Sequence, residues 1–196
     1  MSSIKLTADS GGGTFEIKTP SSSGNTRVLT LPDTGNLTLG ETGIVQVVQT
    51  FKTDSFSESV GAQNASSVVM SVNITPTSAT NKLLIKAIVH MSSGSASNSI
   101  GFNFSKDGTE QPLASADGNR IRCTGVNGNE RNYYITPLVA EYLVVAGGTS
   151  QQTWGVMLRS GSGGTQTLKL NRSSLNDNGV GNLLPVSSIT IYEVAV

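Results

Sequence analysis

The sequence predicts an all-β protein in two parts: a small N-terminal segment of short strands over residues 1–42, and an antiparallel, jelly-roll-like β-sandwich over residues 43–196. Apolar and polar residues alternate with a period of two over several long runs, as in half-buried strands. Gly, Asn, Ser and Thr fill much of the chain, and they favour turns and strands. Gly, Asn, Ser and β-branched residues interrupt every candidate helical stretch, so no helix is predicted.

The N-terminal segment forms strands but has too few apolar residues to build a core. Short strands are predicted at residues 4–8, 14–19, 27–32 and 36–39. Pro32-Asp33-Thr34-Gly35 is a turn signal, because Pro fixes φ, Asp bonds to the following backbone and Gly accepts a positive φ. A chain of roughly 40 residues seldom buries enough surface to fold alone. We therefore expect intertwined copies or a docking surface to complete this segment, which ends between Gly40 and Gly43.

From Ile44 onward the strands lengthen and the alternation sharpens. One apolar face each is expected for residues 66–74, 82–91, 99–105, 152–159 and 166–172. In the first of these runs, the apolar face consists of Val68, Met70, Val72 and Ile74. Residues 44–53, 133–145 and 186–196 are apolar on both faces in parts, as in central or interface strands. Residues 106–132 and 173–187 are predicted loops, which in β domains often serve function or contact other chains.

Composition excludes several classes of protein. The net charge is zero, the pI is about 6.6 and the 13 basic residues are scattered, which argues against nucleic acid as a partner. The single cysteine excludes an intrachain disulfide and a cysteine-rich zinc site. There is no apolar signal region, and no apolar run reaches the roughly 18–20 residues of a membrane span. We therefore expect assembly in a cytoplasm and no membrane insertion.

No catalytic constellation is visible, so the sequence predicts neither an enzyme nor a cofactor or metal site. His90 is the single histidine, and without marked partners it is expected on the surface or in a subunit contact. A metal site with one His90 per chain on a threefold axis is the alternative. Cys123 is expected to be a structural thiol. Gly161-Ser162-Gly163-Gly164 lacks the ending of a phosphate loop and is predicted to be a hairpin turn.

Five residues are candidates for contacts with a receptor: Arg120, Arg122, Arg131, Tyr133 and Tyr134. The arginines are the nearest approach to a basic cluster. The tyrosines are adjacent, so in a strand they face opposite ways, and an exposed ring could stack on a sugar. The alternative places one ring in the core and the other between subunits, since Tyr is favoured at interfaces as well as in cores.

Several motifs resemble those of tailed-phage fibre proteins, especially from aquatic phages. Residues 3–39, with Ser3-Ile4-Lys5-Leu6 and Leu31-Pro32-Asp33-Thr34-Gly35, resemble the N-terminal unit of these fibres. The segment from Ile44 to Asp54 resembles the start of their distal domain. So do Asn73-Ile74-Thr75-Pro76, Lys82-Leu83-Leu84-Ile85, Leu170-Asn171-Arg172-Ser173-Ser174 and Ile189-Thr190-Ile191-Tyr192-Glu193-Val194. The order and spacing of these motifs carry the resemblance across nearly the whole chain.

The resemblance implies a homotrimeric virion fibre with a narrow base and a jelly-roll-like head domain. Residues 1–42 would attach it to other virion proteins and the head domain would bind host surface polysaccharide. The chain is short, with a single basal unit, which favours a short fibre, a fibre tip or a capsid-mounted fibre. A capsid decoration protein that stabilises the shell is the alternative. A polysaccharide depolymerase is less favoured, because no pair of carboxylates at the required separation is evident.

Overall fold

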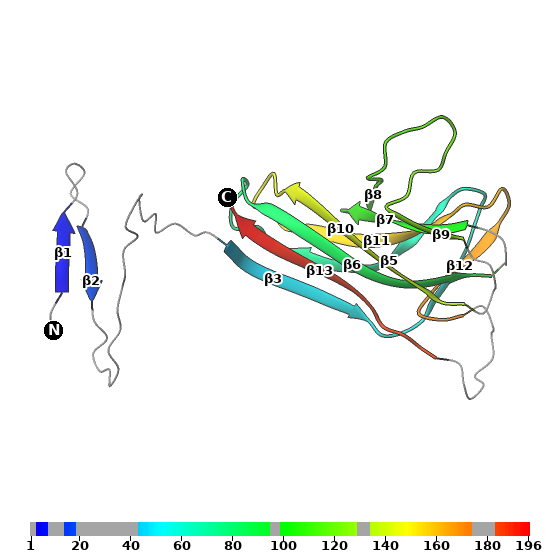
Figure 1. The fold of residues 1–196 in the computed structure, drawn as a ribbon, viewed down its shortest axis with the longest axis horizontal. Coiled ribbons are helices and arrows are strands. Elements are labelled where there is room, and N and C mark those ends of the chain that lie inside the picture. Colours follow the sequence, from blue (N-terminus) through cyan, green and yellow to red (C-terminus); the bar gives the residue numbers. More distant parts are fainter. Residues whose placement is uncertain (1–2, 8–13, 19–42, 95–98, 129–133, 174–182) are drawn as a thin grey trace. The chain divides into compact units, whose positions relative to one another are not determined.

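The structure is a computed structural model that describes residues 3–7, 14–18, 43–94, 99–128, 134–173 and 183–196 (Figure 1). Over these residues it contains strands and no helix, which confirms the all-β prediction. The chain divides into two compact units, Met1–Gly40 and Glu41–Val196.

The N-terminal unit contains an antiparallel pair of strands, β1 (Ser3–Thr7) and β2 (Thr14–Lys18), in which Ile4 pairs with Ile17. The strands expected at residues 27–32 and 36–39, and the turn between them, lie outside the described residues. The role of this unit in attachment and trimerisation stays a prediction.

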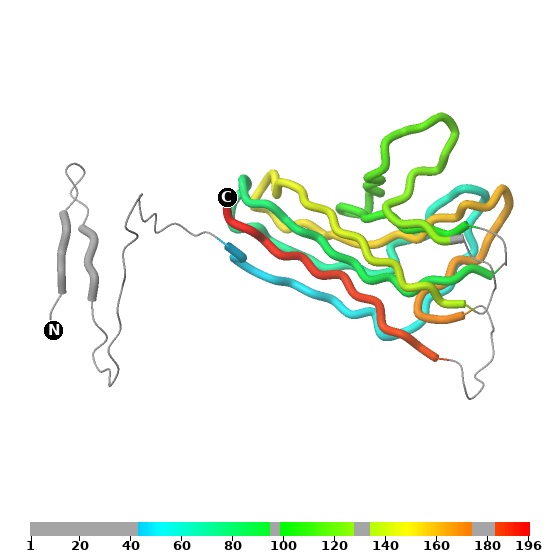
Figure 2. Tube along the Cα trace, in the orientation of Figure 1, coloured from blue at the N-terminus to red at the C-terminus, as the bar shows by residue number. Residues whose placement is uncertain are grey.

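The C-terminal unit is a sandwich of two antiparallel sheets. The β6 sheet contains β3 (Gly43–Lys52), β4 (Phe56–Val60), β6 (Lys82–Ser93), β10 (Thr136–Val145), β12 (Gln166–Leu170) and β13 (Ser187–Ala195). The β7 sheet contains β5 (Ala65–Ile74), β7 (Ser99–Lys106), β8 (Thr109–Gln111), β9 (Gly125–Gly128) and β11 (Gln152–Ser160). Figure 2 shows the long strands β3, β13, β6 and β10 running side by side.

The strand order is that of a jelly roll. β13 and β12 follow each other along one edge of β6, and β10 lies along the other edge. Across the β6 sheet the order is therefore β10, then β6, then β13 and β12 along the same edge of β6, then β3 beside β13 and β4 beside β12. Across the β7 sheet the order is β5, then β11, then β7, then β8 and β9, which both pair with β7. The connections from β4 to β5 to β6 to β7, and from β9 to β10 to β11 to β12, each cross from one sheet to the other, as in a jelly roll.

Three sequence predictions about connections and strands were wrong. The turn at Gly161–Gly164 does not close a hairpin, because β11 and β12 belong to different sheets. The region 106–132 contains two short strands, β8 and β9, each of which pairs antiparallel with a different part of β7. The strand β4 was not predicted at all, since its sequence, Phe56-Ser57-Glu58-Ser59-Val60, is mostly polar.

The core lies between the two sheets and is formed by the alternating apolar residues that the sequence identified. Residues such as Leu83, Ile85, Phe102 and Phe104 are fully buried. Aromatic rings run through its centre: Phe104 stacks on Tyr142 with ring centroids 6.3 Å apart, and Tyr142 meets Trp154 edge-on at 6.0 Å.

The predicted face of residues 66–74 needs one correction. Val69 is buried and Val68 is 37% exposed, the reverse of the expected alternation. The register between β5 and β11 shifts beside Val156 and Met157, so an irregularity of the β-bulge type turns Val68 outward. The side chain of Val68 there packs over Gly155, where an added Cβ would lie 2.7 Å from its Cγ1.

Asn171 fills the junction where β12 and β13 meet against β6. It is fully buried, with a φ of 57°. Its Nδ2 donates to the carbonyls of Lys52 (2.6 Å) and Asp54 (3.0 Å), and its Oδ1 accepts from the Ser187 hydroxyl (2.6 Å). Its backbone N–H donates to the carbonyl of His90 at 2.8 Å. One side chain thus links the connection between β3 and β4 to the first residue of β13.

Glu193, on the inward side of β13, is also fully buried. Its carboxylate accepts hydrogen bonds from Asn81 Nδ2 (2.7 Å), from the backbone N–H and the hydroxyl of Thr77 (2.8 Å each) and from the Gln46 amide. Burial by itself raises the pKa of this carboxyl, but the hydrogen bonds from Gln46, Asn81 and Thr77 outweigh it and lower the pKa from 4.5 to about 2. The carboxylate therefore holds the 75–81 connection against the end of the β6 sheet.

Candidate binding surfaces

Two of the five predicted contact residues lie together on one loop. The loop of residues 112–124 joins β8 to β9 and projects from the β7 sheet (Figure 1). Arg120 and Arg122 are both exposed on it, and the Arg120 guanidinium forms an ion pair with Asp117. Tyr134 is 49% exposed and lies just before β10. Arg131 and Tyr133 lie outside the described residues.

The base of this loop is fastened by a polar residue that the sequence analysis did not single out. Asn103 on β7 is fully buried. Its Nδ2 donates to Glu110 Oε1 (2.8 Å) and to the Arg122 carbonyl (2.9 Å), and its Oδ1 accepts from the Thr124 N–H at 2.6 Å. Glu110 in turn accepts from Arg159 Nη1 at 2.7 Å. Both ends of the loop are therefore fixed, which reduces the entropy lost when its exposed part binds a ligand.

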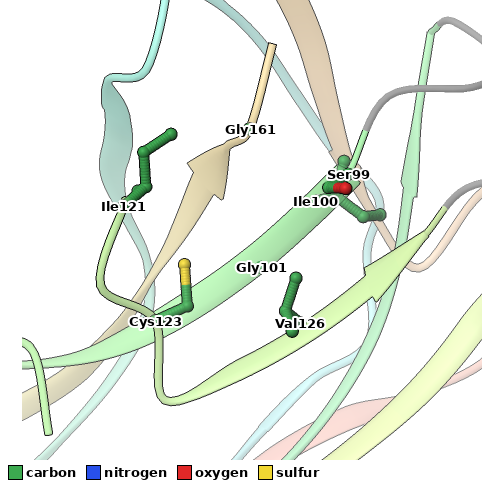
Figure 3. Close-up of a pocket in the computed structure, with 7 residues that line it drawn as sticks. All are labelled: Ser99, Ile100, Gly101, Ile121, Cys123, Val126 and Gly161. Atoms are coloured by element: carbon green, nitrogen blue, oxygen red, sulfur yellow. The ribbon is translucent and has the colours of Figure 1, made fainter. Parts of the chain in front are cut away.

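Two adjoining cavities lie between this loop and the β7 sheet, and they share Ile121, Cys123 and Val126. The first, of about 190 Å³, is lined by Ser99, Ile100, Gly101, Ile121, Cys123, Val126 and Gly161 (Figure 3). The second, of about 300 Å³, is lined by Ala114, Ser115, Asp117, Arg120, Ile121, Arg122, Cys123 and Val126. We call the second cavity the loop cleft. Its lining combines apolar side chains with two arginines and one aspartate.

Cys123 lies at the point where the two cavities meet. Burial raises the pKa of its thiol, and the nearby Glu110 charge adds to this while Arg159 opposes it. The thiol is therefore protonated at neutral pH, which makes it a poor nucleophile. Its structural role stays a prediction.

Replacing Gly101, which lines the first cavity, with alanine is expected to displace Cys123 and β9. An added Cβ at this position would lie 2.7 Å from the Gly125 carbonyl oxygen and 2.8 Å from Cys123 Sγ, so β9 and the cysteine must shift. We expect a loss of about 1–3 kcal/mol in the free energy of unfolding, as for other overpacked sites. Reaction of Cys123 with a maleimide should become faster. Gly148→Ala is the matched control, since nothing lies within 4 Å of a Cβ there; equal effects of the two variants would contradict the prediction.

His90 lies on the outer side of β6 and is half-buried. Its Nδ1 is buried and has no hydrogen-bond partner in the described part of the chain. Within that part, no group of three or more His, Cys, Asp and Glu residues is placed to hold a metal ion. Among the described residues, no helix is long and apolar enough to cross a membrane.

The outer face of the β6 sheet carries cross-strand rows of side chains, in which one polar row lies between two mostly apolar rows. One apolar row consists of Val47, Tyr192, Leu84 and Leu143, and another of Phe51, Ser188, Ile88 and Val139. The row between them is polar and consists of Gln49, Thr190, Lys86 and Glu141. Ile44, Val194, Lys82 and Val145 form a fourth row. The strands predicted to be central or at interfaces thus present one exposed apolar face.

No protein-family model and no curated protein matches the sequence. Solved structures that are similar include that of infectious bursal disease virus Gt strain, with a TM-score of 0.43 and 13% identity over 87% of this chain and 43% of that chain. T=1 particles derived from infectious bursal virus have a TM-score of 0.42 and 14% identity, over 87% of this chain and 41% of that chain. The VP2 subviral particle of infectious bursal disease virus has a TM-score of 0.41 and 14% identity, over 77% of this chain and 38% of that chain. The chain spans less than half the length of each of these proteins, and likeness at this level identifies neither family nor function.

Proposed function

We propose that this chain is a structural protein of a phage virion, a short homotrimeric fibre that adsorbs to host surface polysaccharide. Residues 1–42 would attach it to other virion proteins, and the C-terminal sandwich would be displayed. The motif resemblance to tailed-phage fibres supports this assignment, and so does the jelly-roll strand order. The observation that supports adsorption is the loop cleft, an open site on a loop whose two ends are fixed.

The chemistry of the loop cleft suits a sugar ring. Ile121 and Val126 line it with apolar side chains, and Val126 is 63% exposed. Arg122 and Arg120 supply planar donors for hydroxyl or acidic groups on the sugar. A cleft of about 300 Å³ accommodates one or two rings, so a single site would bind weakly. Three sites on one particle would raise the avidity through a high effective concentration.

Binding of the full chain to immobilised bacterial surface polysaccharides, acidic and neutral, tests this proposal. Arg122→Ala is expected to weaken the affinity about tenfold, as loss of a charged hydrogen bond does. Lys52→Ala is the control, because it removes the same charge from the other sheet, where Lys52 pairs with Asp54. Adsorption through the loop cleft is wrong if no polysaccharide binds, or if both variants bind equally well.

A capsid decoration protein is the second candidate, and the exposed apolar face of the β6 sheet favours it, since such a face could lie flat on a shell. The two candidates differ in where the protein lies on the virion and in what its removal does to the capsid. Electron microscopy of virions would find a decoration protein on the capsid, and capsids without it would break at lower temperature. No catalytic step belongs to either candidate, so the purified protein should release no reducing ends from host polysaccharide.

A further inference from the structure

The outer face of the β6 sheet exposes several large apolar side chains. The exposed fractions are 62% for Ile44, 52% for Val47, 59% for Phe51, 59% for Val139, 55% for Leu143 and 53% for Val145. All six side chains lie on the same face of the sheet. The largest apolar patch on a typical monomer covers roughly 300–600 Å² and is often functional.

The face is also large enough for a stable interface. Its four strands, β3, β13, β6 and β10, lie side by side without a break (Figure 2). Leu84, Ile88 and Tyr192 are half-buried and continue the apolar surface across the middle strands. Four strands about 4.8 Å apart, each over about eight residues of roughly 3.3 Å, give a face of the same order as the roughly 800 Å² that each partner contributes to an interface of standard size.

The polar row across this face is already paired within the chain. Gln49 Nε2 donates to the Thr190 hydroxyl at 2.8 Å, and Lys86 Nζ lies 3.2 Å from Glu141 Oε1. The row is therefore neutral as a whole and needs no charged partner. A nucleic acid or an acidic peptide would find little to pair with. The surface that fits is another flat face with apolar rows on both sides of a neutral row.

A second copy of the chain presents such a face. A half-turn about an axis through the polar row exchanges the apolar row of Val47 and Leu143 with that of Phe51 and Val139. Apolar rows of two copies can thus meet each other and bury their surface, while polar rows meet polar rows.

We infer that copies of this chain associate through the outer face of the β6 sheet. The inference concerns the surface of contact, and it shares with the proposed function only the expectation of a homo-oligomer. The loop cleft lies against the other sheet, so association through this face leaves the cleft open. Assembly and ligand binding are then separable by substitutions on opposite sides of the sandwich.

The test is the mass of the full chain in solution, measured by light scattering and by native mass spectrometry. The parent protein is expected to be an oligomer. The double variant Val47→Asp with Leu143→Asp places a charge at each end of an apolar row and is expected to be a folded monomer. Val126→Asp, on the β7 sheet, places a charge at an equally exposed residue and should leave the mass unchanged.

A second measurement keeps the inference testable if the double variant does not fold. In Val139→Cys, the new thiol should react with a maleimide at least tenfold more slowly than the thiol of Val126→Cys, with Cys123 of the parent as the background. Equal rates in the assembled protein would overturn the inference. If Val139→Cys reacts slowly although the protein is a monomer, residues 1–42 of the same chain cover the face, and the inference is wrong.

The outcomes separate this inference from the proposed function. A trimer that the face variants leave intact contradicts the inference and agrees with the proposed fibre. A dimer that the face variants dissociate supports the inference and contradicts the fibre's trimer. A parent protein that is a monomer with a reactive Val139→Cys overturns the inference, whatever the loop cleft binds.

Discussion

Glu193→Gln is expected to lower the free energy of unfolding by about 3 kcal/mol at pH 7, because it removes a buried charge from groups arranged to receive it. The amides of Gln46 and Asn81, and the N–H and hydroxyl of Thr77, all donate to this carboxylate. A glutamine at the same place has one oxygen and one further NH₂ group. Donors would then face a donor inside the protein, and at least one group would stay unpaired.

The same residue predicts how stability depends on pH. The pKa of Glu193 falls from 4.5 to about 2 on folding, so between these values the unfolded state binds more protons than the folded state. The stability that the carboxylate contributes is present above pH 4.5 and is lost as the pH falls toward 2. The loss amounts to about 3 kcal/mol.

Urea denaturation of the parent and of Glu193→Gln at pH 7 and pH 3 would measure both effects. The difference between the two proteins should shrink markedly at pH 3. Asp117→Asn is the control, since this exposed acid pairs with Arg120 at the surface and contributes less than about 1 kcal/mol. A difference between parent and Glu193→Gln that is the same at both pH values would contradict the prediction.

Asn171→Ala is expected to destabilise the sandwich by about 3–4 kcal/mol, because three partners lose their hydrogen bonds together. These are the carbonyls of Lys52 and Asp54 and the hydroxyl of Ser187. The φ of 57° adds a backbone penalty of about 1 kcal/mol for alanine, which asparagine tolerates better. Thermal unfolding followed by circular dichroism would measure the loss.

Asn171→Gly separates the two contributions to this loss. Glycine accepts the positive φ, so it should recover the backbone part and leave the hydrogen-bond part. Gln63→Gly is the matched control, because Gln63 has the same φ of 57° and an exposed side chain. If Asn171→Gly were as stable as the parent, the side-chain hydrogen bonds at this junction would not stabilise the sheet.

The long strands could be predicted because the alternation of apolar and polar residues along each strand matches which of its side chains are buried. In β6 the residues from Leu83 to Met91 alternate strictly, and each inward residue is buried whatever the neighbouring strand supplies. The short strands β4, β8 and β9 were missed for the opposite reason. Their residues are largely polar or glycine, and pairing with a strand distant in the sequence or with β7 defines them.

The polar residues that organise the molecule could not be predicted from sequence. Glu193 meets Asn81 across 112 residues, and Asn171 meets Lys52 across 119. A buried acid or amide has the same local pattern as an exposed one until its distant partner is known. The candidate site is divided in the same way: Arg120 and Arg122 were found because they are charged, while Asn103, which fixes their loop, looked like an ordinary polar strand residue.

The position of β3 has a consequence for folding kinetics. Its ladder partner is β13, and the pairing of Gln49 with Thr190 closes a very long loop of chain. Contacts between residues so distant in sequence slow folding, because the entropy of closing the loop is lost before the contact forms. Until β13 is in place, β3 has no ladder partner, and its backbone is open beside the apolar side chains of Val47 and Phe51. During folding this strand is therefore a site for aggregation. Rapid folding of this unit at low protein concentration should therefore raise the yield of native protein.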